Sequence, residues 1–157
     1  MAKINKTMKK FSYWLMAAFA VMCVCSSCSK DEDEGGNIDS KSLIGTWRCV
    51  SVEGYEIYDG EKEEWKDVYN DPDEYWGMTF NADGTGVEFD YYDGDEYKEN
   101  FTWTLSGNKL TVRYAGVEGG TAIVETLTST QLVTVFEWVS PDGKEKEYEK
   151  DTFTRVK

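Results

Sequence analysis

Residues 76–105 read WGMTFNADGTGVEFDYYDGDEYKENFTWTL, and this stretch decides the fold class. The tetrapeptide NADG at 81–84 and the pair Asp93-Gly94 are turn sequences that typically join two paired strands. Apolar and polar residues alternate between these turns and again over 97–105, which is the period of a strand with one buried face. The stretch therefore predicts consecutive antiparallel strands joined by tight hairpins.

The same alternation and turn spacing continue on both sides of this stretch. We expect strands at 46–52, 76–80, 87–91, 97–105, 110–114, 122–127, 131–139 and 147–156. A parallel sheet would need crossover connections of a dozen or more residues, usually helical, and the sequence shows no long helix pattern. It therefore predicts an all-β fold, an antiparallel up-and-down barrel of about eight strands, with a β-sandwich as the alternative.

One connection, residues 54–74, is long for a compact domain and holds nine acidic residues and two lysines. The spacing of Trp65, Val68 and Tyr69 fits one side of a short helix. Asp59-Gly60 fits equally well the turn of an additional hairpin, which would give nine or ten strands. Both alternatives stay open at the level of sequence.

The charge balance excludes several functions. Acidic residues outnumber basic ones by 30 to 17 in 157 residues, and the chain has no histidine. The net charge of −13 argues against nucleic acid as a partner, because phosphates need clustered lysine and arginine. The lack of histidine excludes Ser-His-Asp triads and His-ligated zinc. No carboxylate pair stands out, so we predict no enzymatic activity, no catalytic residues and no cofactor.

Two acidic segments, 71–74 and 90–96, offer oxygen ligands that calcium accepts. Neither follows the spacing of an EF-hand loop, and Asp-Gly pairs are common in hairpin turns for conformational reasons. We therefore predict no metal site.

The first 28 residues have the layout of an export signal. Residues 1–10 carry four lysines and no acid, and residues 11–25 are uncharged and apolar apart from Ser12. This run is shorter than the roughly 20 residues that span a bilayer as a helix, so it fits a secretory signal. An uncleaved membrane anchor is the alternative.

The segment ends in Cys25-Ser26-Ser27-Cys28, which resembles the lipobox of bacterial lipoproteins. The resemblance implies cleavage before Cys28 and attachment there of a diacylglycerol and an acyl chain such as palmitate, which anchors the protein to a membrane. We therefore expect three parts: a lipoprotein signal peptide at 1–27, a lipidated acidic tether at 28–38 and one barrel domain at 39–157.

The tether continues with Ser29-Lys30 and the run DEDE at 31–34. Like charges repel one another and keep a chain extended in water, so a solvated spacer is the plain interpretation. A lysine and acids directly after the lipidated cysteine also resemble the export signal of Bacteroidota-type surface lipoproteins. That resemblance implies an outer-membrane location with the domain exposed at the cell surface.

Short motifs in the domain resemble a known family. Gly45-Thr46-Trp47 opens the first expected strand, FNADGTG occupies 80–86, Phe101-Thr102-Trp103 follows, and Arg155 lies near the end. In this order and spacing they resemble the lipocalin-like domains of Bacteroidota-type secreted lipoproteins, which are calycin-like β-barrels. The resemblance implies that Trp47 closes the barrel floor and that Arg155 packs over its ring.

A barrel of eight strands either fills its interior with side chains or holds one small ligand. The aromatic residues that alternate along candidate inward faces are Phe89, Tyr91, Phe101, Trp103, Tyr114, Phe136 and Trp138. The first hypothesis is that they line a site that binds or carries a small hydrophobic or amphipathic molecule. The alternative is a filled barrel that docks a protein or glycan partner at the cell envelope through the 54–74 connection.

Overall fold

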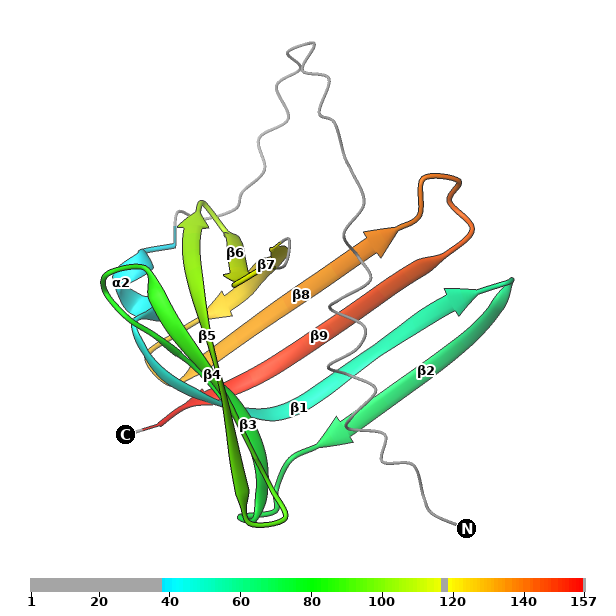
Figure 1. Cartoon of the computed structure of the whole chain (residues 1–157). Helices are drawn as coiled ribbons and strands as arrows, with labels where there is room; N and C mark the ends of the chain where they lie inside the picture. The colour runs from blue at the N-terminus through cyan, green and yellow to red at the C-terminus, as the bar shows by residue number, and fades with distance from the viewer. Residues whose placement is uncertain (1–37, 117–118, 157) are drawn as a thin grey trace, which may run out of the picture.

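The computed structural model describes residues 38–116 and 119–156 (Figure 1). Within these residues it contains the elements α2 Ser40–Leu43, β1 Gly45–Tyr58, β2 Glu61–Val68, β3 Glu74–Phe80, β4 Thr85–Tyr92, β5 Asp95–Ser106, β6 Lys109–Tyr114, β7 Gly120–Leu127, β8 Gln131–Val139 and β9 Lys146–Arg155. In the same ranges, no helix has the length and apolar character needed to cross a membrane.

The strands of the described ranges form one antiparallel sheet in the order β2-β1-β3-β4-β5-β6-β7-β8-β9. β9 also pairs with β1, from Trp47↔Arg155 to Ile57↔Lys146, so the sheet closes on itself. Eight strands therefore form a barrel, and β2 is an extra strand beside β1. The prediction of an all-β antiparallel barrel of about eight strands is confirmed, and the β-sandwich alternative does not apply.

Most of the connection at 54–74 is the hairpin of β1 and β2, paired from Ser51↔Val68 to Tyr58↔Glu61. Asp59 and Gly60 form its turn with φ values of 55° and 83°. Glycine adopts positive φ freely and aspartate tolerates it better than most residues, as a two-residue hairpin turn requires. The hairpin alternative is therefore correct, and the short helix is not formed.

β1 changes its partner along its length. Gly45–Arg48 pair with β3, whereas Ser51–Tyr58 pair with β2. On the other side of the β3–β4–β5 segment, β6 pairs with Phe101–Ser106 of β5. The barrel is therefore closed at the end where β1 begins, which we call the floor. At the other end, the mouth, β1, β2, β8 and β9 diverge from β3, β4 and β5 (Figure 1).

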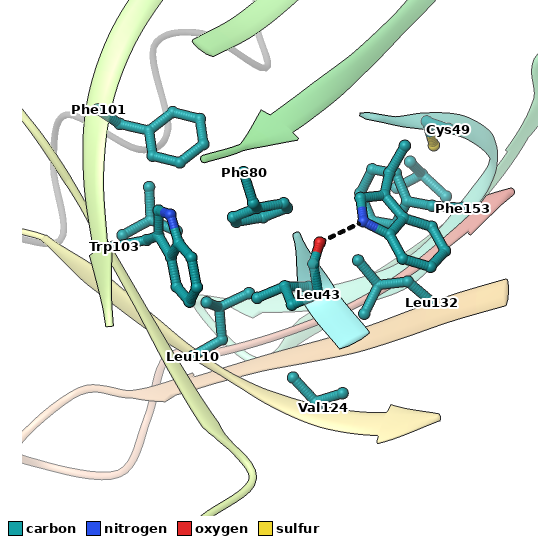
Figure 2. Close-up of a cluster of buried hydrophobic side chains, with 12 residues drawn as sticks. Leu43, Cys49, Phe80, Phe101, Trp103, Leu110, Val124, Leu132 and Phe153 are labelled. Atoms are coloured by element: carbon teal, nitrogen blue, oxygen red, sulfur yellow. Dashed lines mark hydrogen bonds between the residues drawn. The ribbon is translucent and has the colours of Figure 1, made fainter. Parts of the chain in front are cut away.

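The core lies at the floor, where buried side chains from α2 and the strands meet (Figure 2). It consists of Leu43, Trp47, Cys49, Val52, Phe80, Phe101, Trp103, Leu110, Val112, Val124, Leu132 and Phe153. Successive side chains of a strand point to opposite faces, so these residues fix which positions of each strand point into the barrel. Among the described residues, the buried members of the core lie between Leu43 and Phe153, and the partly buried Ile38 packs against them.

Candidate functional site

Trp47 and Arg155 seal the floor. Trp47 is fully buried, and its indole Nε1 donates a hydrogen bond of 2.8 Å to the Leu43 carbonyl. The Arg155 guanidinium lies 4.2 Å from the centre of the Trp47 ring, in a cation–π contact. Arg155 also donates to the carbonyls of Ile44 at 2.8 Å and Ser129 at 2.9 Å. The end of β9 is thereby tied to α2 and to the β7–β8 turn.

The absence of a side chain at Gly45 leaves space for the Arg155 guanidinium. The φ of Gly45 is +138°, and a Cβ at this position would lie 2.4 Å from Nη1 of Arg155. Non-bonded heavy atoms do not approach that closely, so a larger residue at 45 would push the guanidinium away from Trp47. The Gly-x-Trp motif has a steric reason in this barrel, because the glycine admits the cation that the tryptophan ring receives.

An aromatic layer lies directly above the floor. The Phe80 ring packs edge-on against Phe101 at 5.5 Å and against Trp103 at 5.6 Å between centroids. The Trp103 indole donates to the Thr85 carbonyl at 2.9 Å, so its polar atom is satisfied inside the barrel. Phe101 also contacts Tyr114 at 5.9 Å. Mutually packed aromatic side chains therefore occupy this lower half of the barrel.

Towards the mouth, acids join aromatic residues at the inward positions of several strands. Glu99 has the same parity as Phe101 on β5, and Glu149 has the same parity as Phe153 on β9. The half-buried inward carboxylates are Glu56, Asp67, Glu74, Glu88, Asp90, Glu99, Glu147, Glu149 and Asp151. Half-buried aromatic residues on the same surface are Trp65, Trp76, Tyr92, Tyr114, Phe136 and Trp138. We call this surface the mouth lining.

Glu88 is the most enclosed of the carboxylates for which a cause of pKa change is resolved. Burial raises its pKa, the neighbouring charges of Glu99 and Asp90 raise it further, and a hydrogen bond from the Tyr114 hydroxyl acts in the opposite direction. Asp90 follows the same pattern, with its pKa raised by burial and by Glu74. Each cause that raises these values penalises the charged form of the carboxyl.

A second group of carboxylates lies on the opposite part of the mouth. Burial, with the charges of Glu149 and Glu56, raises the pKa of Glu147 to about 7. Glu147 pairs across the sheet with Trp138, and Glu149 pairs with Phe136. Each acid of this pair therefore lies beside an aromatic side chain on the same face.

The outer face of the same strands carries the opposite charge balance. The lysines and arginines at outward strand positions are Arg48, Lys62, Lys66, Lys98, Lys109, Arg113, Lys146 and Lys150. Outward acids form ion pairs with several of them, such as Lys66–Glu53 at 2.7 Å and Lys150–Glu125 at 2.6 Å. Cations on the strands thus balance acids outside the barrel, while acids predominate inside its mouth.

A separate groove of about 560 Å³ lies on the outer face of β3 and β4. Its wall includes Tyr75 and Phe89, whose rings contact at 6.3 Å, and the Arg48 guanidinium lies 4.3 Å from the centre of the Tyr75 ring. Tyr91 stacks on Tyr75 at 5.3 Å. Aromatic rings and a cation therefore form a continuous surface outside the barrel.

The structure divides the aromatic residues singled out in the sequence among three places. Phe101 and Trp103 belong to the core, and Tyr114, Phe136 and Trp138 belong to the mouth lining. Phe89 and Tyr91 lie on the outer face of β4, because their neighbour Glu88 reaches inward to Tyr114. The alternation in sequence correctly groups Phe89 with Tyr91, but period alone does not tell the inner face from the outer.

The inward carboxylates were not among the sequence candidates. The sequence feature that could have found them is alternation, because residues two apart on a strand share a face. Glu99 shares the face of Phe101 and Trp103, and Glu147 and Glu149 share the face of Phe153. Cys28, the expected lipidation site, lies outside the described residues. Within the described residues, no group of three or more histidine, cysteine or acidic side chains is arranged to hold a metal ion.

The structure thus combines a closed antiparallel barrel with a cation–π contact between Arg155 and Trp47. The chain belongs to the lipocalin-like domain family, whose sequence description matches residues 43–134.

Several solved structures are similar to this barrel. A bovine odorant-binding protein in complex with undecanal shares 18% identity over 82% of this chain and 78% of that one, with a TM-score of 0.42. A bovine lipocalin allergen shares 16% identity over 76% of each chain, with a TM-score of 0.44. A lobster apocrustacyanin shares 16% identity over 75% of this chain and 63% of that one, with a TM-score of 0.48. None of the curated proteins compared with the sequence matches it significantly.

Proposed function

We propose that this protein binds or carries a small hydrophobic or amphipathic molecule at the mouth of its barrel, without transforming it. One observation carries the proposal. The floor aromatics are buried by one another, whereas Trp65, Phe136 and Trp138 lie on inward positions and remain partly exposed. Aromatic surface that faces the inside of a barrel and is not covered by the protein is suited to an apolar ligand.

The site of action in this proposal is the cell envelope. The apolar run at 11–25 and the lipobox-like sequence ending at Cys28 support a lipid anchor, and the acidic run at 31–34 supports display on the outer membrane. Cys28→Ser should move the protein from the membrane fraction to the soluble fraction. Retention of the variant in the membrane fraction would contradict anchoring through this cysteine.

Ligand binding is tested on residues 29–157, which contain the whole barrel and its core. The protein is incubated with an envelope lipid extract and examined by native mass spectrometry. We expect a discrete added mass that organic extraction removes, and displacement of the neutral probe N-phenyl-1-naphthylamine by the same extract. No added mass together with no probe binding would contradict the proposal.

Two variants locate the binding. Trp138→Ala removes an aromatic side chain from the mouth lining and should weaken probe binding about tenfold or more, the scale of a lost buried aromatic contact. Phe89→Ala removes one from the outer face of β4 and should leave probe binding unchanged. Weaker probe binding by Phe89→Ala with unchanged binding by Trp138→Ala would place the probe outside the barrel.

The second candidate function is docking of a protein or glycan partner, and the outer groove of Tyr75 and Phe89 favours it. Aromatic and arginine side chains are enriched among the residues that anchor interfaces, and Arg48 accompanies both rings here. In this case Phe89→Ala should abolish capture of envelope proteins or glycans, and Trp138→Ala should not. The two variants therefore separate the two functions.

A further inference from the structure

The two faces of the barrel strands differ in charge, and the difference is greatest at the mouth. Acids at inward positions come from the adjoining strands β9, β1, β2, β3, β4 and β5, so they line a large part of the mouth rather than form one local cluster. The lysines of the same strands point outward, as Lys62, Lys98 and Lys150 do, and each of these forms an ion pair there. The interior of the mouth is therefore an anionic surface within an outer shell of paired charges.

Aromatic rings lie between these acids. Trp138 and Phe136 are the cross-strand neighbours of Glu147 and Glu149, and the Tyr114 hydroxyl donates to Glu88. An ammonium group is attracted both to the face of an aromatic ring and to a carboxylate, and the attraction grows when water is excluded. Burial, and then the charges of neighbouring acids, raise the pKa values of Glu88, Asp90 and Glu147, so the charged forms of these carboxyls are penalised where they lie.

Trp65 adds an unsatisfied polar group to the same surface. The Trp65 ring lies on the inward side of Gly54, where a Cβ would approach it to 2.8 Å. Its Nε1 is buried and has no hydrogen-bond partner in the described structure. A buried indole N–H normally finds an acceptor, so the Trp65 N–H is a donor that the described residues leave unsatisfied.

We infer that the molecule taken up by the barrel is a cationic amphiphile, with its apolar part against the mouth aromatics and its ammonium group among the inward carboxylates. The inference rests on the proposed binding function and names the ligand class. Fatty acids and other anionic amphiphiles are disfavoured, because their head groups would meet carboxylates of like charge. An uncharged apolar molecule would form no ion pair with the inward carboxylates.

The test uses three probes with the same eight-carbon chain and different head groups: octyltrimethylammonium, octanol and octanoate. Binding to residues 29–157 is measured by calorimetry below the micelle concentration and at fixed salt. We expect the cation to bind at least about tenfold more tightly than octanol, and octanoate to bind more weakly than octanol, from the sign and closeness of the mouth charges. Preference for octanol or octanoate over the cation would overturn the inference.

Two variants, each with three carboxylates replaced by amides, complete the test. The mouth variant E88Q/E147Q/E149Q should weaken cation binding at least about tenfold and change octanol binding less than about twofold. The outer variant E53Q/E64Q/E125Q should change the affinity for the cation and for octanol by no more than about twofold. Its charges lie outside the barrel, where water and salt screen their effect on the mouth. Equal effects of both variants on the cation would overturn the inference, while retained octanol binding would leave the proposed function standing. Failure of all three probes to bind would overturn both.

Discussion

The floor and the mouth of this barrel are built from the same strands, yet they differ in almost every physical property. On β5, Phe101 and Trp103 belong to the core, whereas Glu99 occupies an inward position towards the mouth. On β9, Phe153 is buried at the floor end and Glu147 lies at the mouth. The inner faces of β5 and β9 therefore change from apolar to acidic along their length.

The difference separates stability from recognition. Burial of apolar surface at the floor contributes most of the favourable free energy of folding. The inward carboxylates contribute in the opposite direction, because partial burial and mutual repulsion penalise their charged forms. Groups that oppose folding at a surface open to ligand are common where a protein binds something, since the bound molecule supplies the missing partner.

The largest effect is expected from a change at the floor. Trp47→Ala leaves a cavity between α2 and the Arg155 guanidinium, so the free energy of unfolding should fall by about 3–5 kcal/mol. Trp138→Ala, the same change at a partly exposed mouth position, should cost clearly less. Urea unfolding followed by circular dichroism measures both. Equal losses would contradict the division into a stabilising floor and a binding mouth.

A smaller loss is expected from Arg155→Lys. The substitution keeps the positive charge but removes the planar group that serves the Trp47 ring and the carbonyls of Ile44 and Ser129 together. The free energy of unfolding should fall by about 1–3 kcal/mol, and the Trp47 indole proton should exchange faster with solvent. Lys146→Arg, on the outer face near the mouth, is the matched control and should change neither. Unchanged exchange in Arg155→Lys would show that the arginine does not close the floor.

The sequence predicts the fold well because hairpin turns and alternation are local signals. The NADG turn and Asp93-Gly94 each join the strands that the sequence assigns to them. The 54–74 connection is harder, because Trp65 and Val68 suit one side of a helix but point to opposite faces of a strand. In the structure Trp65 packs against the core while Val68 is 61% exposed, and only pairing with β1 decides between the two.

The candidate site is less accessible to sequence reasoning. Alternation places Phe89 with Tyr91 and Phe101 with Trp103, but it does not tell which pair faces inward. That choice depends on the pairing between strands. Gly86 lies opposite Phe101 and leaves space for the Phe101 ring on the inner face. The even-numbered positions of β4 therefore face the interior. The acidic mouth becomes visible only once this parity is known, since in the sequence its members are spread among 30 acids.

The pH dependence of stability tests the cost of the mouth carboxylates. The pKa of Glu147 is about 7 in the folded state against an ordinary value of 4.5, so the folded state binds more protons between these values. The contribution of Glu147 to the free energy of unfolding is therefore most favourable below about pH 4.5 and is lost as the pH rises through 7. The loss amounts to about 1–2 kcal/mol after allowance for partial solvent exposure. Glu88 and Asp90, whose pKa values are also raised, act in the same direction.

Glu147→Gln should therefore flatten the decline in stability between pH 5 and 8 and should make the protein more stable than wild type at pH 8. Thermal unfolding across this range measures it. Glu64→Gln is the control, because its carboxyl lies on the outer face beside Lys62 and its pKa is lowered, so its titration falls below this window. Stability that rises with pH in the wild type would contradict the expected sign.

The smallest effect is expected from the ion pairs of the outer face. Lys150 and Glu125 are 2.6 Å apart and their side chains are 30% and 43% exposed, so solvent and salt screen their attraction. Lys150→Met should lower the free energy of unfolding by less than about 1 kcal/mol, and added salt should abolish the difference. A larger, salt-resistant loss would mean that charges on the outer face hold the barrel together. In that case the ion pairs outside and the like charges inside would differ because of their roles in stability, and a ligand would not be needed to explain the acidic mouth.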